Sequence, residues 1–140
     1  IRDRWKGKLV VKGIVNEEDA ESVIKLGVDG IIASNHGGRQ LDSGQSTIKP
    51  LSMLVEKFGD KTTVMIDSGI RGGQDVACAL ATGAKFTFMG RSFMYGVGAL
   101  GNKGGQHTMT MLKRQLQQVM EQLACEKVTD FPNHLIIDKG

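Results

Sequence analysis

The sequence contains few aromatic residues and no cluster of basic ones. Aromatic side chains make up 5% of its 140 residues, and the formal net charge is only +3. Lys103, Lys113 and Arg114 are scattered, as on the solvated surface of an ordinary helix. Nucleic-acid binding needs stacking rings or a continuous basic stripe. The composition therefore predicts no nucleic-acid partner.

Long apolar runs and metal-binding clusters are also missing. No run approaches the ~18 apolar residues of a membrane-spanning helix. The first residues, IRDRWKGKLVVKG, lack the apolar middle of a signal peptide, and their abrupt start before a strand suggests a fragment of a longer chain. Cys78 and Cys125 lie far apart in helix-like stretches, with no histidine at a metal spacing. We interpret them as reduced packing thiols of a cytoplasmic protein, and we expect the isolated His107 and His134 at the surface.

Strand-like and helix-like patterns alternate along the chain. The predicted strands cover residues 9–11, 30–34, 63–66 and 85–89, and the predicted helices cover 16–27, 48–58, 74–82 and about 104–124. The strands are almost continuously apolar, which is typical of a parallel sheet covered on both faces. An open doubly wound α/β sheet and a (β/α)8 barrel both satisfy this pattern. A barrel needs about 250 residues, so four βα units would form half of one.

Local signals refine this assignment. Asn16 is a good N-cap, and Gly27 is a plausible helix stop. A G-x-G-x-x-G match at 96–101 does not directly follow a strand, so we interpret it as a loop before the last helix. The tail from residue 128 to 140 is expected to be irregular. Methionines are interpreted as helix core filling, among them Met109, Met111 and Met120.

Polar and charged residues follow each predicted strand. They are Lys12 after the first, Ser34, His36 and Arg39 after the second, Asp67, Ser68 and Arg71 after the third, and Gly90 and Arg91 after the fourth. Ligands of parallel α/β folds bind at this edge of the sheet. Because these residues include a lysine, a histidine and three arginines but only one carboxylate, we expect a site for an anionic ligand there.

His36 and Arg39 belong to the stretch SNHGGRQLD. Imidazole suits proton transfer near neutral pH, and guanidinium offers a planar fork to a carboxylate or phosphate. Gly37 and Gly38 would let a small substrate approach the backbone closely. The stretch therefore predicts a carboxylate held by Arg39 with its reacting carbon beside His36. The alternative is a structural histidine that is hydrogen-bonded to backbone.

Two consecutive strand ends combine glycine with arginine, in DSGIRGG and MGRSF. Backbone N–H groups at a helix start suit a phosphate, and Arg71 and Arg91 add positive charge. The last two βα loops of barrels frequently bind phosphate. The alternative for these two stretches is ordinary turns with solvent-facing arginines. The alternative for Lys12 is a lysine at a strand end whose ammonium reaches into solvent.

These residues resemble the carboxyl-terminal half of the FMN-dependent α-hydroxy acid dehydrogenases, the family of L-lactate dehydrogenase, glycolate oxidase and mandelate dehydrogenase. The resemblance covers nearly all of the chain and rests on the segments LVVKGI, EDAESVIKLGVDGIIASNHGGRQLD and MIDSGIRGGQDVACALATGAKFTFMGRSF. DSG stands where many members have DGG, and GRS where many have GRP. The resemblance implies a (β/α)8 TIM barrel, with residues 1–140 forming about the last four βα units. It also implies FMN and the oxidation of an L-2-hydroxy acid, lactate-like, to the 2-oxo acid.

The resemblance also implies a role for individual residues. His36 is the base, Arg39 binds the substrate carboxylate, and Lys12 faces the N1/O2 edge of the flavin. Ser34 touches the flavin as well. The residues implied to hold the ribityl and phosphate groups are Asp67, Ser68, Gly69, Ile70, Arg71, Gly90 and Arg91. In the family, the substrate-binding tyrosines and the aspartate that orients the base lie upstream of the stretch that begins here at Ile1.

The partners implied by the resemblance are the hydroxy acid and an electron acceptor, which is oxygen, a quinone or a haem protein. The full-length protein is expected to form a homo-oligomer and, if the acceptor is a quinone, to associate with the membrane periphery. The isolated segment would be a half-barrel with two open sheet edges, and we expect it to be inactive alone. Two alternatives remain, namely a non-catalytic fragment that binds FMN or phosphate, and a non-redox phosphate-binding barrel enzyme.

Overall fold

A computed structural model describes residues 1–136 of the chain. These residues form two compact units. The first comprises Ile1–Gly69 and Gly83–Phe88, and the second comprises Ile70–Thr82 and the chain from Met89 onward.

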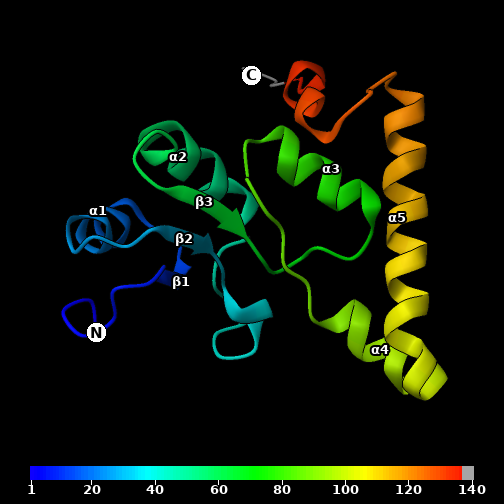
Figure 1. Ribbon diagram of the computed structural model, residues 1–140, viewed down its shortest axis with the longest axis horizontal. Helices are drawn as coiled ribbons and strands as arrows, with labels where there is room; N and C mark the ends of the chain where they lie inside the picture. Colours follow the sequence, from blue (N-terminus) through cyan, green and yellow to red (C-terminus); the bar gives the residue numbers. More distant parts are fainter. Residues whose placement is uncertain (137–140) are drawn as a thin grey trace. The chain divides into compact units, whose positions relative to one another are not determined.

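The first unit is built on a parallel sheet with the strand order β1-β2-β3 (Figure 1). Its elements are β1 (Val10–Ile14), α1 (Glu17–Lys25), β2 (Gly30–Ala33), α2 (Ile48–Phe58) and β3 (Thr63–Ile66). The central strand β2 is buried at every residue, as expected for a parallel sheet. α2 packs against β2 and β3, and α1 packs against β1 and α2. The predicted parallel α/β class and the first three strands are confirmed.

The helices of this unit begin and end where their sequences indicate. The Asn16 side chain accepts a hydrogen bond from the N–H of Asp19, and Gly27 adopts a left-handed φ of 81° after α1. Leu51, Leu54 and Phe58 are buried along one stripe of α2. Burial at a spacing of three to four residues is the period of an amphipathic helix.

The predicted fourth strand at 85–89 is only partly formed, which corrects that prediction. The structure has a single parallel bridge between Ile66 and Thr87. Backbone hydrogen bonds from Lys85 to Val64 and from Phe88 to Ile66 keep this segment beside β3. The segment therefore lies where a fourth strand would lie, without a full ladder.

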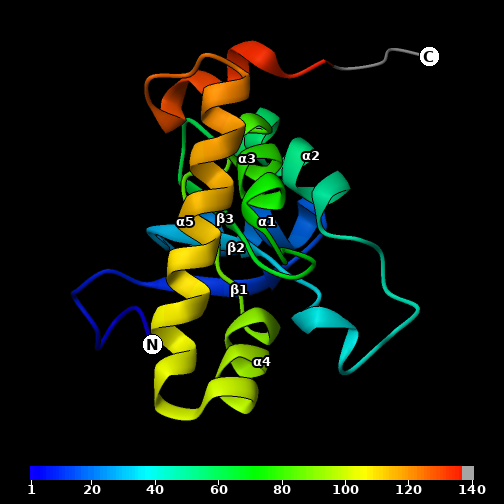
Figure 2. The ribbon, with the colours of Figure 1, turned by 90° about the vertical axis from the view of Figure 1, so that its right-hand side faces the viewer.

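The second unit consists of helices packed against one another. They are α3 (Gly73–Ala81), α4 (Arg91–Leu100) and α5 (Gly104–Gln122), with short 3-10 segments η2 (Gly101–Lys103) and η3 (Val128–His134). α5 packs against α3 and against α4, and η3 packs on α3 (Figure 2). The core of this unit contains Ala77, Cys125 and Phe131.

Four predictions for this unit are wrong. The glycine-rich stretch at 96–101 is mostly helix α4 and not a loop, and the tail forms η3 over 128–134 with Phe131 buried. Residues 137–140 of the predicted irregular tail lie outside the described residues. Cys125 is a buried packing thiol as predicted, but Cys78 is exposed. The core prediction also fails for two methionines, since Met109 and Met111 are exposed.

No helix within residues 1–136 combines the length and apolar character needed to cross a membrane.

Candidate functional site

Three strand-borne residues of the first unit form one polar network. The Lys12 ammonium donates to Ser34 Oγ at 2.8 Å and pairs with Asp67 Oδ2 at 2.8 Å. Ser34 directly follows β2 and Asp67 directly follows β3, so the parallel register brings them to the same edge of the sheet. The structure thus brings these three predicted cofactor residues together. Lys12 is paired, so it is not simply a strand-end lysine reaching into solvent.

A β-bulge places Lys12 in this network. The strand β1 continues past the predicted run to Ile14, and its register against β2 shifts between Lys12 and Ile14. Gly13, between them, has a φ of 100°, which glycine adopts readily. Because a bulge re-aims the side chains beside it, this shift accounts for Lys12 reaching over the end of the neighbouring strand.

The Asp67 carboxyl remains ionised in this network. Burial on its own would raise its pKa, but hydrogen bonds from Lys12, Ser34 and Ser68, together with the charge of Lys12, lower the pKa below its ordinary value. The site therefore contains a matched ion pair. The ammonium has three N–H donors. Among the residues that the structure describes, its contacts with Ser34 and Asp67 use two of them, which leaves one donor for a ligand.

The loop after β2 holds the predicted base in an unusual backbone conformation. His36 has a φ of 56°, and Gly37 and Gly38 have φ values of 68° and 72°. The N–H of His36 donates to Ser34 Oγ at 3.1 Å, and the N–H of Gly37 donates to Ser68 Oγ at 3.0 Å and to Asn35 Oδ1 at 2.9 Å. The backbone around His36 is therefore tied to the ends of both β2 and β3.

The side chains of His36 and Arg39 lie exposed beside this network. Within the described residues, neither the imidazole nor the guanidinium forms a hydrogen bond or ion pair with the protein. Both groups are therefore available to a ligand. The structural alternative for His36, an imidazole bonded to backbone, finds no support among these residues.

Thr47 is a buried site residue that the sequence did not reveal. It precedes α2 at the N-cap position but makes no capping hydrogen bond. Its hydroxyl lies 3.1 Å from the carbonyl oxygen of Asp67 and 3.2 Å from that of Ser68, so it donates to the turn after β3 instead. A threonine directly before a predicted helix indicates a cap, and only the fold shows that its hydroxyl turns elsewhere.

The second unit contains four further predicted cofactor residues, namely Ile70, Arg71, Gly90 and Arg91, whereas Ser68 and Gly69 belong to the first unit. The boundary between the units falls between Gly69 and Ile70. The Ser92 hydroxyl donates to the carbonyl oxygen of Arg71 at 3.2 Å, and this bond joins the turn after Ile70 to the turn at Gly90 and Arg91. The two glycine and arginine turns are thus adjacent within this unit.

The two helix starts in these turns differ in their capacity for an anion. At α3, Asp75 already accepts the N–H groups of Arg71 and Gly72, at 2.8 and 3.0 Å. At α4, the N-cap is Gly90, the first turn contains no acid, and no side chain caps the helix. A Cβ added at Gly90 would meet nothing within 4 Å. The start of α4 is therefore the one suited to a phosphate.

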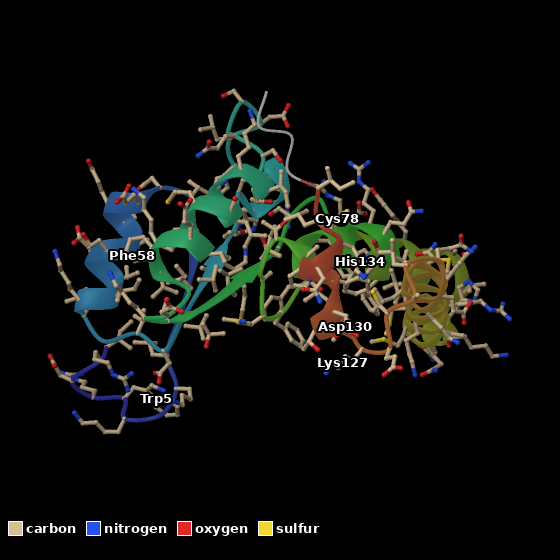
Figure 3. The ribbon with its side chains drawn as sticks, turned by 90° about the horizontal axis from the view of Figure 1, so that it is seen from above. Trp5, Phe58, Cys78, Lys127, Asp130 and His134 are labelled. Carbon is tan, nitrogen blue, oxygen red and sulfur yellow. The ribbon has the colours of Figure 1, made fainter. Side chains whose placement is uncertain are left out.

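A hollow of about 720 Å³ lies elsewhere in the second unit, lined by α3, α5 and the segment that includes η3. Cys78 and His134 are on its wall (Figure 3). None of the predicted site residues lines it.

Residues 1–138 match the sequence model of a family described as FMN-dependent dehydrogenase. The chain belongs to this family. The L-lactate dehydrogenase of Actinobacillus pleuropneumoniae serotype 5b is 38% identical over 138 residues, and the (S)-mandelate dehydrogenase of Pseudomonas putida is 43% identical over 140 residues. These matches cover 99% and 100% of this chain but 36% and 35% of those proteins. The chain thus spans about a third of the length of these FMN-dependent dehydrogenase relatives.

Solved structures give the same family assignment. A soluble mutant of the membrane-associated (S)-mandelate dehydrogenase from Pseudomonas putida has a TM-score of 0.91 and 42% identity, covering 98% of this chain and 39% of that one. A mandelate oxidase structure has a TM-score of 0.88 and 35% identity, covering 94% of this chain and 40% of that one. The family predicted from SNHGGRQLD and its companion segments is confirmed.

Proposed function

We propose that the chain is the carboxyl-terminal half of a (β/α)8 TIM barrel, about its last four βα units, in an enzyme that oxidises an L-2-hydroxy acid to the 2-oxo acid with FMN. The observation that carries this proposal is the network of Lys12, Ser34 and Asp67 beside the exposed His36 and Arg39. Together these residues would supply a base, a carboxylate clamp and a cation for the cofactor. The named relatives support a substrate such as lactate or mandelate.

His36 and Arg39 are proposed to act on the substrate. Arg39 binds the carboxylate through its planar fork, which orients the hydroxyl-bearing carbon. Oxidation of that carbon releases two electrons and two protons. His36 would accept one of the protons, and the other would leave with the two electrons to the cofactor. Both side chains are exposed and unpaired within the described residues, so neither has to break a protein contact to do this.

The residues of the network suit the ring system of FMN. Bound FMN would supply the acceptor for the two electrons. The Lys12 ammonium has one N–H donor left for a ligand, and its positive charge would favour negative charge on the ring. Ser34 and Asp67 hold the ammonium in place. Asp67, Ser68 and Gly69 are proposed to border the ribityl chain. Gly69 has a φ of 78° and open space where a side chain would be.

Ile70, Arg71, Gly90 and Arg91 are proposed to bind the remainder of the ribityl chain and the phosphate. The acid-free start of α4 supplies backbone N–H groups, and the two arginines supply charge. The bond from Ser92 to Arg71 supports a shared role for the two turns.

The electron acceptor is proposed to be oxygen, a quinone or a haem protein. One related structure is described as the monotopic membrane protein (S)-mandelate dehydrogenase. That likeness supports association with the membrane periphery, alongside the cytoplasmic location expected from the sequence. We also propose that the full-length protein is a homo-oligomer.

The proposal is tested on the protein as its gene encodes it. The purified protein should be yellow, with a visible flavin spectrum that anaerobic addition of L-lactate or (S)-mandelate bleaches, and release of FMN on denaturation. A protein that stays colourless after incubation with FMN would instead favour a non-redox phosphate-binding barrel. Residues 1–140 expressed alone should show no turnover, and FMN retained by them would favour the non-catalytic binding fragment.

A further inference from the structure

Two serine hydroxyls bond the backbone on both sides of His36. The N–H of His36 donates to Ser34 Oγ at 3.1 Å, and the N–H of Gly37 donates to Ser68 Oγ at 3.0 Å. These two N–H groups belong to the peptide bonds that flank the His36 Cα. Both hydroxyls are also bonded to Asp67, since Ser68 Oγ donates to its Oδ1 at 2.7 Å and Ser34 is a further hydrogen-bond partner of that carboxylate.

The conformation of Ser68 indicates that its hydroxyl has a specific task. Its φ is 71°, in the left-handed region that glycine adopts without strain and other residues rarely adopt. Glycine at this position would remove the strain but could not bond Gly37. Strained residues of this kind persist where the surrounding structure holds them, often at functional sites.

The contacts of Ser68 point to the His36 loop. Its hydroxyl donates to Asp67 and accepts from Gly37, so the side chain is engaged within the protein. The turn that carries Ser68 is in turn held by the buried Thr47, whose hydroxyl donates to the carbonyl oxygens of Asp67 and Ser68. Ser68 is therefore a fixed point to which the loop after β2 is attached.

We propose that Ser68 is a positioning residue for His36. Its hydroxyl, aligned by Asp67 on a turn held by Thr47, fixes the Gly37 N–H and thereby keeps His36 at positive φ, with the imidazole directed to the substrate. The inference rests on the proposed function, in which His36 accepts the substrate proton. In this proposal the Ser68 hydroxyl serves to position His36, and only the backbone of Ser68 is available to the cofactor.

The test compares Ser68→Gly with Ser68→Ala in the flavin-loaded full-length protein. Both variants lack the hydroxyl, but glycine relieves the left-handed strain and alanine retains it. If the hydroxyl positions His36, both variants should reduce bound FMN at least about tenfold more slowly than the native protein, since small displacements of a reacting group cost one to two orders of magnitude. Their FMN dissociation constants should stay within about threefold of native. Ser52→Ala, on the exposed face of α2, is the matched control.

Stopped-flow reduction is measured alongside melting temperature and the isotope effect of a substrate deuterated at the reacting carbon. A role limited to stability would separate the two variants, with Ser68→Gly more stable and fully active, and that result would overturn the inference. So would reduction within twofold of native in both variants, or a loss of FMN affinity that matches the loss of rate. If the native protein does not reduce FMN, the proposed function fails together with this inference. If the native protein is active and both variants match it, this inference alone fails.

Discussion

Left-handed backbone conformations are concentrated at the residues proposed to carry the chemistry. Three non-glycine residues among those described have positive φ, and two of them are His36 and Ser68. Each such residue costs about 1–2 kcal/mol. The bonds from Gly37 to Ser68 and from His36 to Ser34 offset that cost. Strain at His36 and at Ser68 is thus balanced locally, by hydrogen bonds that a ligand does not have to supply.

Replacement of His36 by glutamine tests the proposed base. His36→Gln retains a polar side chain but has no group that titrates near neutral pH, so flavin reduction by the hydroxy acid should slow by about 10²- to 10⁴-fold. FMN should remain bound, because within the described residues the imidazole forms no hydrogen bond or ion pair with Lys12, Ser34 or Asp67. Rapid-mixing absorbance measures the first effect and fluorescence titration the second. His107→Gln, exposed on α5, is the control, and near-native reduction by His36→Gln would remove His36 from the mechanism.

Replacement of Arg39 by methionine tests the carboxylate clamp. Arg39→Met should lower kcat/KM about 10- to 100-fold, because loss of a hydrogen bond to a charged group costs about 1.5–3 kcal/mol. Arg39→Lys keeps the charge without the planar fork and should recover only part of the loss. Steady-state kinetics with the hydroxy acid and FMN titration provide the measurements. An equal loss of substrate and FMN binding would argue against a clamp specific to the substrate.

At the scale of elements, the crossing of α4 and α5 explains why the glycine-rich stretch forms a helix. A Cβ at Gly104 would collide with the backbone of Gly96 and Val97, and a Cβ at Gly96 would collide with the Thr108 hydroxyl. The two helices can approach this closely only because both positions are glycine. The sequence analysis assigned a loop because the glycine motif does not directly follow a strand. Glycine is also a poor helix former, and the missing information was the tertiary contact that favours it here.

This crossing gives a prediction with an internal control. Gly96→Ala should destabilise the protein by about 1–3 kcal/mol, because the added methyl overpacks the crossing. Gly98→Ala, two residues along α4 with nothing within 4 Å of the added atom, should be neutral or stabilise by up to about 1 kcal/mol. Urea unfolding monitored by circular dichroism compares the two variants. Equal effects would show that the close approach is not a source of stability.

At the scale of the whole molecule, the sequence predicted the strand ends better than the contacts between them. Ser34 and Asp67 were placed correctly because parallel strands end at one edge, a rule that needs no coordinates, whereas Lys12 lies within β1, which continues to Ile14. The bonds of Thr47 and Ser68 could not be predicted, since each spans at least twenty residues and depends on side-chain rotamers. The fourth strand was overestimated, because an apolar run indicates burial more reliably than it indicates a hydrogen-bonded ladder.

Asp29 likewise escaped prediction, and it ties the start of the chain to the sheet. Its carboxylate accepts from Lys8 Nζ at 2.8 Å, from the N–H of Leu9 at 2.9 Å and from the Arg2 guanidinium at 3.1 Å. The hydrogen bond from Lys8, then that from Leu9, lower its pKa from 3.8 to about 2. Because the pKa is lower in the folded state, the carboxylate contributes stability that is complete above about pH 4 and is lost as the pH falls toward 2.

The acid sensitivity of the molecule should therefore change in Asp29→Asn. At pH 6 the urea midpoint of native protein should exceed that of the variant, since asparagine cannot replace the charge beside Lys8 and Arg2. The gap between the two midpoints should narrow below about pH 4 and close as the pH falls toward 2, as protonation removes the advantage of the native carboxylate. Asp60→Asn, an exposed acid with no partner among the described residues, is the control and should follow native protein throughout. A gap between native protein and Asp29→Asn that stays constant down to pH 3 would mean that Asp29 stabilises the chain by contacts that do not depend on its charge.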